Sequence, residues 1–197
     1  MTASPDDLAA LAARVRAGDR AAFEALFRRL HGPLVRYAGT LAVEGAEDAV
    51  QDAFLAVWRR RATLDPSRSL QSLLYTAVRN ALLNRRRDAA RRDELHETMD
   101  APDAPPTPDA EAAAALLGER LRGWLDELPE RQREAFGLSR FDGLSYAEIA
   151  GVMACSVKTV ENHVGRALTA LRDRLREHAP EARSEERRVG KELFSSV

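Results

Sequence analysis

A proline-rich acidic segment between two helix-forming blocks constrains this chain more than any other sequence feature. From Asp93 to Ala115 the sequence reads DELHETMDAPDAPPTPDAEAAAA, and residues 93–119 hold eight acidic residues and no lysine or arginine. Prolines lack an amide donor and bias the residues before them away from helix. So long a structureless insert inside one compact domain would be unusual. We therefore predict an extended linker over residues 93–111, with one folding unit on each side.

Both flanking blocks have the periodicity of amphipathic helices. Apolar residues recur three and four positions apart, and no stretch alternates with the two-residue period of a strand. Ser4 and Asp19 are the expected N-caps of the first two helices, which end at Gly18 and at His31-Gly32-Pro33. Further helices are predicted at 34–42, 46–62, 69–91, 112–127, 130–140, 145–153 and 156–177. We predict an all-α fold of two small helical domains, 1–92 and 112–178, joined by the acidic linker.

Charge is distributed unevenly, although the formal net charge is only −1. Residues 1–92 carry 16 arginines against 10 acidic residues, whereas residues 120–182 carry ten charges of each sign. The neutral average therefore conceals a basic N-terminal block beside the acidic linker, so it does not argue against a nucleic-acid partner.

Several classes of protein are excluded by what the sequence lacks. Cys155 is the single cysteine, so neither an intramolecular disulfide nor a zinc module is expected. No apolar run approaches the ~20 residues of a membrane span. The N-terminus, MTASPDDLAA, lacks the basic-then-apolar order of a signal peptide. We expect a cytoplasmic protein with no membrane span.

The sequence shows no nucleophile–base pair, paired carboxylates, glycine-rich phosphate loop or cluster of metal ligands. Its four histidines are scattered: His31, His96, His163 and His178. We predict no catalytic residue, no metal site and no cofactor, and an enzyme is the weakest of the functional hypotheses.

Residues 144–175 have the pattern of a helix-turn-helix. Ser145 and Glu148 form a capping-box pattern that opens a short helix. Ala154-Cys155-Ser156 is a tight break before a longer helix, which Ser156 caps. In such a pair the second helix normally enters the major groove of DNA.

The face of this second helix opposite its apolar stripe carries side chains that read base edges or hold phosphates. At about 100° per residue, valine, alanine and leucine side chains fall on one stripe. A plain amphipathic hairpin with a solvated face is the alternative interpretation. The polar face comprises Lys158, Thr159, Asn162 and Arg166, with His163 on its flank.

The predicted helix at 46–62 contains AEDAVQDAFLAVWRRR and has an acidic, partly apolar face. Its expected buried stripe is Val50, Phe54, Val57 and Trp58, and the opposite face shows Asp48, Asp52, Leu55 and Arg59 with Gln51 beside them. Two acids and an exposed leucine suit a partner with a basic, partly apolar surface. From this helix alone, a solvated acidic strip is the simpler interpretation.

Residues 65–92, DPSRSLQSLLYTAVRNALLNRRRDAARR, predict a helix with a basic end. Such an end, with an aromatic and an exposed aliphatic residue, suits phosphate contacts and stacking against unpaired bases, and a merely solvated face is the alternative. The expected core side is Leu70, Leu73, Leu74, Ala77, Val78 and Ala81. The expected outer side is Ser72, Thr76, Arg79, Leu83, Arg86 and Arg87, with Tyr75 and Asn80 near its edges.

The chain resembles two known groups. EIAGVMACSVKTVENHV is similar to the DNA-reading module of LuxR-type activators and to the C-terminal domain of bacterial sigma factors. Over roughly residues 20–177 the order FEALFRRLHGPLVRYA, AEDAVQDAFLAVW, SLQSLLYTAVRNALLNRRRDAARR and LPERQREAFGLSRFDGLSYAEIA resembles the extracytoplasmic-function (ECF, group IV) sigma factors. LuxR-type activators lack the two upstream motifs and stay as the alternative.

The resemblance to ECF sigma factors implies a protein that binds core RNA polymerase and directs promoter-specific transcription initiation. The N-terminal domain would bind the clamp helices of the β′ subunit through Asp48, Gln51, Asp52 and Leu55. It would also recognise and open the minus-ten element, with the Asp65–Leu70 loop receiving a flipped base. The implied minus-ten contacts are Arg68, Tyr75, Arg79, Asn80, Arg86 and Arg87.

The same resemblance implies that the C-terminal domain reads the minus-thirty-five element and touches the β flap. The linker would run through the polymerase toward the RNA exit path. A cognate anti-sigma factor is usual in the family, and nothing in the sequence shows one. The implied minus-thirty-five contacts are Ser145, Tyr146, Ser156, Lys158, Thr159, Asn162, His163 and Arg166.

Two features depart from the family's pattern. A tryptophan often found near Leu74-Tyr75 is absent, so Leu74 or Tyr75 would supply that apolar contact. Residues 183–192, RSEERRVGKE, resemble the translation of a common sequencing-adapter oligonucleotide. We therefore expect the natural chain to end near Ala182 and the tail, 179–197, to be an artefact without function.

Overall fold

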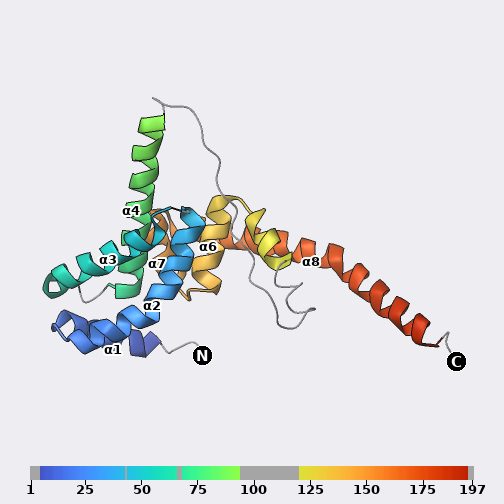
Figure 1. Cartoon of the computed structure of the whole chain (residues 1–197), viewed down its shortest axis with the longest axis horizontal. Coiled ribbons are helices and arrows are strands. Elements are labelled where there is room, and N and C mark those ends of the chain that lie inside the picture. Colours follow the sequence, from blue (N-terminus) through green and yellow to red (C-terminus); the bar gives the residue numbers. More distant parts are fainter. Residues whose placement is uncertain (1–4, 43, 66–67, 94–119, 195–197) are drawn as a thin grey trace. The chain divides into compact units, whose positions relative to one another are not determined.

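The computed structural model describes residues 5–42, 44–65, 68–93 and 120–194, with the backbone alone for 5–7, 89–93 and 178–194 (Figure 1). Its regular elements are all helical, which confirms the all-α prediction. They are α1 (Pro5–Arg16), α2 (Arg20–Leu41), α3 (Ala46–Arg60), the 3-10 turn η1 (Arg61–Thr63), α4 (Leu70–Asp93), α6 (Glu130–Arg140), α7 (Tyr146–Met153) and α8 (Val157–Phe194). Residues 120–126 are helical as well.

The helices belong to two compact units. One unit comprises Met1–Ala104 with Gly137–Val160, and the other comprises Pro105–Phe136 with Glu161–Val197. Residues 137–160 group with the N-terminal helices because α7 packs against α4. Nearly all of the predicted linker lies outside the described residues, and the predicted domain bounds stay predictions. Within the described ranges, no helix combines the length and apolar character that a membrane crossing needs.

The core of the first unit forms where α2, α3 and α4 pack together. Leu26 and Leu34 of α2 and Leu74 of α4 are fully buried. Phe54 of α3 is also buried, and its ring centroid lies 4.8 Å from that of Phe27. The predicted stripe of α3 is therefore confirmed, since Val50, Phe54 and Val57 are buried and Trp58 is partly so.

Helix α2 corrects the predicted break at His31-Gly32-Pro33, because it is continuous from Arg20 to Leu41. A proline disfavours helix in the preceding residue mainly through a clash with that residue's N–H and Cβ. Gly32 has no Cβ, so part of the clash is absent. Leu30 and Leu34, on either side of the proline, are both buried and keep the apolar stripe in phase.

The predicted starts near residues 20, 46, 130, 145 and 156 agree with the structure, the start predicted at 34 falls inside the continuous α2, and the start predicted at 112 lies outside the described residues; a second predicted helix end is also wrong. Asp19 caps α2, since its carboxylate accepts a hydrogen bond from the Ala22 N–H at 3.1 Å. The last helix was expected to end at residue 177, but α8 continues to Phe194. Glutamate, arginine and lysine, which have high helix propensity, are frequent in this extension, which also contains Pro180.

The second unit has its own apolar core. Trp124 and Leu128 pack with Phe136 of α6 and with Ala167 and Leu171 of α8. Glu127, which directly precedes Leu128 in the sequence, forms an ion pair with Arg174 of α8. The apolar side of α8 therefore packs in the core of the second unit. The opposite side of the helix is exposed.

Candidate nucleic-acid interface

The helix-turn-helix begins with the predicted capping box. The Ser145 hydroxyl accepts the Glu148 N–H at 3.3 Å, and the Glu148 carboxylate accepts the Ser145 N–H at 2.8 Å. Burial favours a higher pKa for Glu148, but hydrogen bonds from Ser145 and Ser69 hold that pKa below its usual value. The carboxylate is therefore ionised at neutral pH, as the cap requires.

A tight turn connects α7 to α8. Ala154 ends α7 in the left-handed region, with φ of 51°, and the Cys155 N–H donates to the Ala150 carbonyl at 3.0 Å. The Ser156 hydroxyl then accepts the Thr159 N–H at 3.1 Å, so Ser156 caps α8 as predicted. A helix begun in this way presents a fixed set of side chains from its first turn.

Three of the four residues predicted on the outer face of α8 are exposed. Lys158, Asn162 and Arg166 are exposed, whereas His163 is half-buried with Nδ1 lacking a hydrogen-bond partner. Thr159 is half-buried, and its hydroxyl forms a hydrogen bond with that of Ser156 at 2.8 Å. Of the remaining predicted contacts, Ser145 and Ser156 are exposed and Tyr146 is half-buried.

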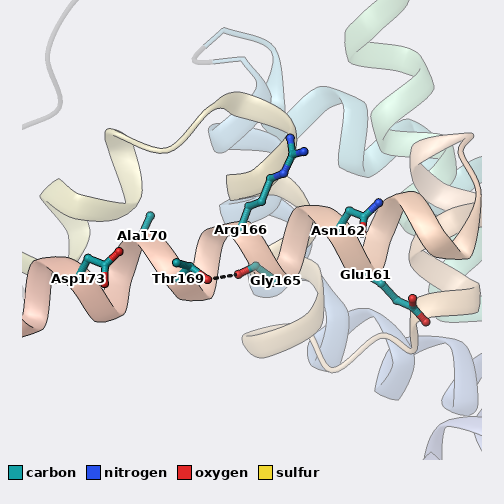
Figure 2. A pocket seen from close by; sticks show the side chains of 7 residues that line it. All are labelled: Glu161, Asn162, Gly165, Arg166, Thr169, Ala170 and Asp173. Atoms are coloured by element: carbon teal, nitrogen blue, oxygen red, sulfur yellow. Dashed lines mark hydrogen bonds between the residues drawn. The ribbon is translucent and has the colours of Figure 1, made fainter.

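An open pocket lies along this side of α8 (Figure 2). Asn162 and Arg166 project from one side of the helix, and Glu161 projects from the other. The pocket therefore offers an amide and a guanidinium one helical turn apart. Its lining residues are Glu161, Asn162, Gly165, Arg166, Thr169, Ala170 and Asp173.

A second exposed surface lies on α3, and we call it the α3 patch: Asp48, Gln51, Asp52 and Leu55. All four are exposed, and Leu55 is 48% exposed despite being a large apolar residue. Asp52 also pairs with Arg85 of α4 at 3.7 Å, and the Arg85 guanidinium donates to the Gly45 carbonyl at 2.9 Å. No sequence pattern predicts this pairing, which joins residues 33 positions apart.

The basic end of α4 is exposed at Asn80, Arg86 and Arg87, as is Arg68 in the preceding turn. Two other predicted minus-ten contacts are buried, which corrects the predicted helix face. Tyr75 is 0% exposed and Arg79 is 5% exposed. The buried side also includes Leu82, which lies outside the predicted core side, whereas Leu73, Ala77 and Ala81 are only half-buried.

The reason for this burial is that α4 has helices on more than one side. It packs against α2 and α3 and, in the same compact unit, against α7. The Tyr75 ring lies 5.1 Å from the ring of Tyr37 in α2. On the α7 side, the Gln71 amide donates to the Asp142 carbonyl at 2.9 Å. A single amphipathic stripe cannot describe a helix with two such interfaces.

Asp142 lies in the turn before α7 and is half-buried beside Tyr75. Burial raises the pKa of Asp142 to about 6, while Tyr75 and the Arg36 guanidinium favour its charged form. Burial, and then the Asp142 charge, raises the pKa of Tyr75. The Tyr75 hydroxyl makes no hydrogen bond of good geometry. No local sequence pattern marks Asp142, because Gln71, Tyr75 and Arg36, which act on it, are all more than 60 positions away in the sequence.

Comparison with known proteins decides the family. Residues 23–92 match Sigma-70 region 2, and residues 119–171 match Sigma-70, region 4. SigM of Mycobacterium tuberculosis, an ECF RNA polymerase sigma factor, is 36% identical over 169 residues, which cover 84% of this chain and 82% of SigM. The chain belongs to the ECF sigma factors of the sigma-70 family.

Two further relatives agree with this ECF sigma factor assignment. SigK of Mycolicibacterium vanbaalenii is 32% identical over 175 residues, covering 84% of this chain and 88% of SigK. The structure of CnrH in complex with the cytosolic domain of CnrY has a TM-score of 0.58 and 28% identity, covering 88% of this chain and 99% of CnrH. The LuxR-type alternative is set aside, because it does not account for the region 2 match.

The sigma factor role is one in transcription initiation by RNA polymerase, with a DNA-binding helix-turn-helix. The region 2 match spans α2, α3 and α4, and the region 4 match spans α6, α7 and the first part of α8. Sigma factors are generally not enzymes. Within the described ranges, no group of histidine, cysteine, aspartate and glutamate residues is placed to hold a metal ion.

Proposed function

We propose that this ECF sigma factor directs core RNA polymerase to promoters by reading a minus-thirty-five and a minus-ten element and capturing the melted strand. The proposal is carried mainly by one observation: matches to region 2 and region 4 occur in order on one chain, and each contains an exposed polar surface. Two DNA-binding modules of moderate affinity, held on one polymerase, increase promoter specificity because binding of one raises the effective concentration of the other at the promoter. Such a protein acts in the bacterial cytoplasm, with the polymerase and the chromosome.

In this proposal the outer face of α8 reads the duplex minus-thirty-five element. Asn162 and Arg166 lie one turn apart on the exposed side of the helix. An arginine makes bidentate bonds to guanine and an asparagine to adenine in the major groove. The exposed Lys158 and Ser156, near the N-terminus of α8, suit phosphate contacts.

The basic end of α4 and the turn before it would hold the minus-ten strand. Arg68, Asn80, Arg86 and Arg87 are accessible in the structure. Unstacking a base costs a few kcal/mol, and a pocket that accepts only the extruded base recovers that energy selectively. Promoter opening is then captured by binding, without covalent chemistry on this chain.

Tyr75 and Arg79 join this strand-binding surface only if α7 and the Asp142 turn leave α4. Both side chains are buried in the described arrangement. We therefore propose that promoter engagement separates residues 137–160 from α4. The contacts to be broken include the Gln71 hydrogen bond and the half-buried Asp142 side chain, in an interface about as extensive as that between α2 and α4.

The protein partners follow from the exposed surfaces and from a relative. The α3 patch, with its acids and exposed leucine, suits the clamp helices of β′, and the region containing α6 to α8 suits the β flap. CnrH has been solved with the cytosolic domain of CnrY. By analogy, we propose a regulatory anti-sigma factor as a further partner of this chain.

In vitro transcription from a genomic fragment library tests this function. Purified core polymerase with the full chain should yield discrete transcripts, and their start sites should share two upstream elements. Core polymerase alone supplies the control. Transcripts that need a second sigma factor already on the polymerase would contradict the proposal.

Arg166→Ala is expected to weaken recognition of the minus-thirty-five element. Loss of one base-reading arginine should cost about 1–3 kcal/mol in discrimination at one position of the element. Competition binding between promoters that differ at single minus-thirty-five positions measures the effect. Arg172→Ala, which removes another exposed arginine from α8, is the matched control. An unchanged preference in the Arg166 variant would remove this residue from base recognition.

A further inference from the structure

Arg16, the last residue of α1, holds both ends of the turn that precedes α4. Its Nη2 donates to the Asp65 carbonyl at 3.1 Å and to the Arg68 carbonyl at 2.9 Å. The Arg68 N–H also donates to the Asp65 carbonyl, at 3.2 Å. One guanidinium therefore binds the carbonyl groups of Asp65 and Arg68, which lie 49 and 52 residues away in the sequence.

The turn leads directly into α4. The Ser69 hydroxyl accepts the Ser72 N–H at 3.3 Å, and Leu70, the first residue of α4, is 3% exposed. Leu70 thus anchors the chain in the core on one side, and Arg16 holds the backbone on the other. The exposed Arg68 side chain projects from a backbone fixed between these two points.

The chemistry of arginine suits this task. A guanidinium presents its N–H groups in a rigid plane, and its charge makes each bond to a carbonyl stronger than a neutral hydrogen bond. Arg16 Nε is buried without a hydrogen-bond partner, so the group is held partly out of water. The two carbonyl bonds offset that loss of hydration.

We propose that Arg16 is a positioning residue for minus-ten recognition, because it holds the carbonyl groups of Asp65 and Arg68 and thereby places the exposed Arg68 side chain that meets the promoter strand. This inference rests on the proposed function, which assigns this turn to the minus-ten element. Arg16 acts through the turn and does not contact DNA. A loop shaped in advance loses less conformational entropy when it binds, so losing the constraint weakens recognition. Arg16 lies before the region 2 match, which begins at residue 23.

Hydrogen exchange of the full chain tests the contact itself. Arg16→Ala should speed exchange of the Arg68 amide by about tenfold, because its bond to Asp65 then lacks a brace. Arg14→Ala is the matched control, since Arg14 is on the same helix but donates to Asp19, at 2.8 Å. Arg16→Lys should give an intermediate rate, because an ammonium is a point charge without the planar fork. Unchanged exchange in Arg16→Ala would overturn the proposal.

Transcription by the holoenzyme tests the role in recognition. The template is a promoter obtained with the wild-type holoenzyme, randomised at its minus-ten element. Arg16→Ala should reduce the preference for the favoured minus-ten base by about tenfold, which corresponds to about 1.4 kcal/mol. The preferences at the minus-thirty-five element should stay unchanged.

The outcomes separate this inference from the function on which it rests. A wild-type minus-ten preference in Arg16→Ala, together with faster exchange, would refute the positioning role and leave the sigma factor role intact. Failure of the wild-type chain to direct any transcription would instead contradict the proposed function, and the inference with it. Equal loss of preference in Arg14→Ala would show a general effect of α1 and would also refute the proposal.

Discussion

Asp52→Arg is expected to lower the affinity of the chain for core RNA polymerase by about a hundredfold, or about 2.7 kcal/mol. Asp52 is exposed in the middle of the α3 patch, beside the half-exposed Leu55. If the patch meets the basic clamp helices of β′, charge reversal places two cations opposite each other. Fluorescence anisotropy of labelled chain titrated with core polymerase measures the affinity.

Two controls separate the interface from the fold. Arg85→Ala breaks the ion pair with Asp52 but leaves the carboxylate on the surface, so it should bind core polymerase nearly as well as the wild type. Glu24→Arg makes the same change of charge at an exposed position of α2, outside the α3 patch. Wild-type affinity in Asp52→Arg would exclude this part of α3 from the interface.

The stability of the first unit is expected to depend on pH through Asp142. Because burial raises its pKa from 3.8 to about 6, the native state favours the neutral carboxyl. The higher native pKa of Asp142 stabilises the fold fully below about pH 4, and this stabilisation is lost as the pH rises through about 6. The difference between a pKa of 3.8 in the unfolded chain and about 6 in the native state corresponds to about 3 kcal/mol in the free energy of unfolding. Tyr75 of α4 and Arg36 of α2 face this carboxyl.

Asp142→Asn isolates this effect, since the amide stays neutral at every pH. The variant should equal the wild type in free energy of unfolding near pH 4 and exceed it by about 2–3 kcal/mol above pH 7. Urea denaturation followed by circular dichroism measures both. Asp173→Asn, at an exposed position of α8, should show no such trend. If the difference in free energy of unfolding between Asp142→Asn and the wild type stays constant from pH 4 to 8, Asp142 does not have a raised pKa in the native state.

The same variant tests whether the contact with α4 competes with promoter binding. A neutral side chain at position 142 favours the buried arrangement, in which Tyr75 and Arg79 are inaccessible. Holoenzyme carrying Asp142→Asn should therefore form fewer open complexes than the wild type at neutral pH. An equal yield would show that separating the Asp142 turn from α4 does not limit promoter opening.

Local rules predicted most of the helices. Capping by Asp19, Ser145 and Ser156 is visible in the sequence because an N-cap needs only a side-chain oxygen near the next turn. The continuous α2 was not predicted, since Gly32-Pro33 normally signals a break. Burial of Leu30 and Leu34 overrode that signal, and burial depends on the other helices of the bundle.

The candidate surfaces were predicted where they depend on one helix and missed where they depend on two. The α3 patch and the outer face of α8 follow from helical phase alone, and both are exposed. Tyr75 and Arg79 have the same phase argument but are buried, because α4 is covered on more than one side. Arg16 was missed for a related reason, since its acceptors are backbone carbonyls, which no side-chain pattern marks.

Permanganate reactivity of promoter thymines is the most direct test of the central claim, that this chain enables core polymerase to open a promoter and hold the separated strand. Thymines of the minus-ten element should become reactive only when core polymerase and the full chain are both present. Lower thymine reactivity in the double variant Arg86→Ala, Arg87→Ala would assign strand capture to the exposed end of α4. Unreactive thymines with both proteins bound to a promoter that they select would contradict the account.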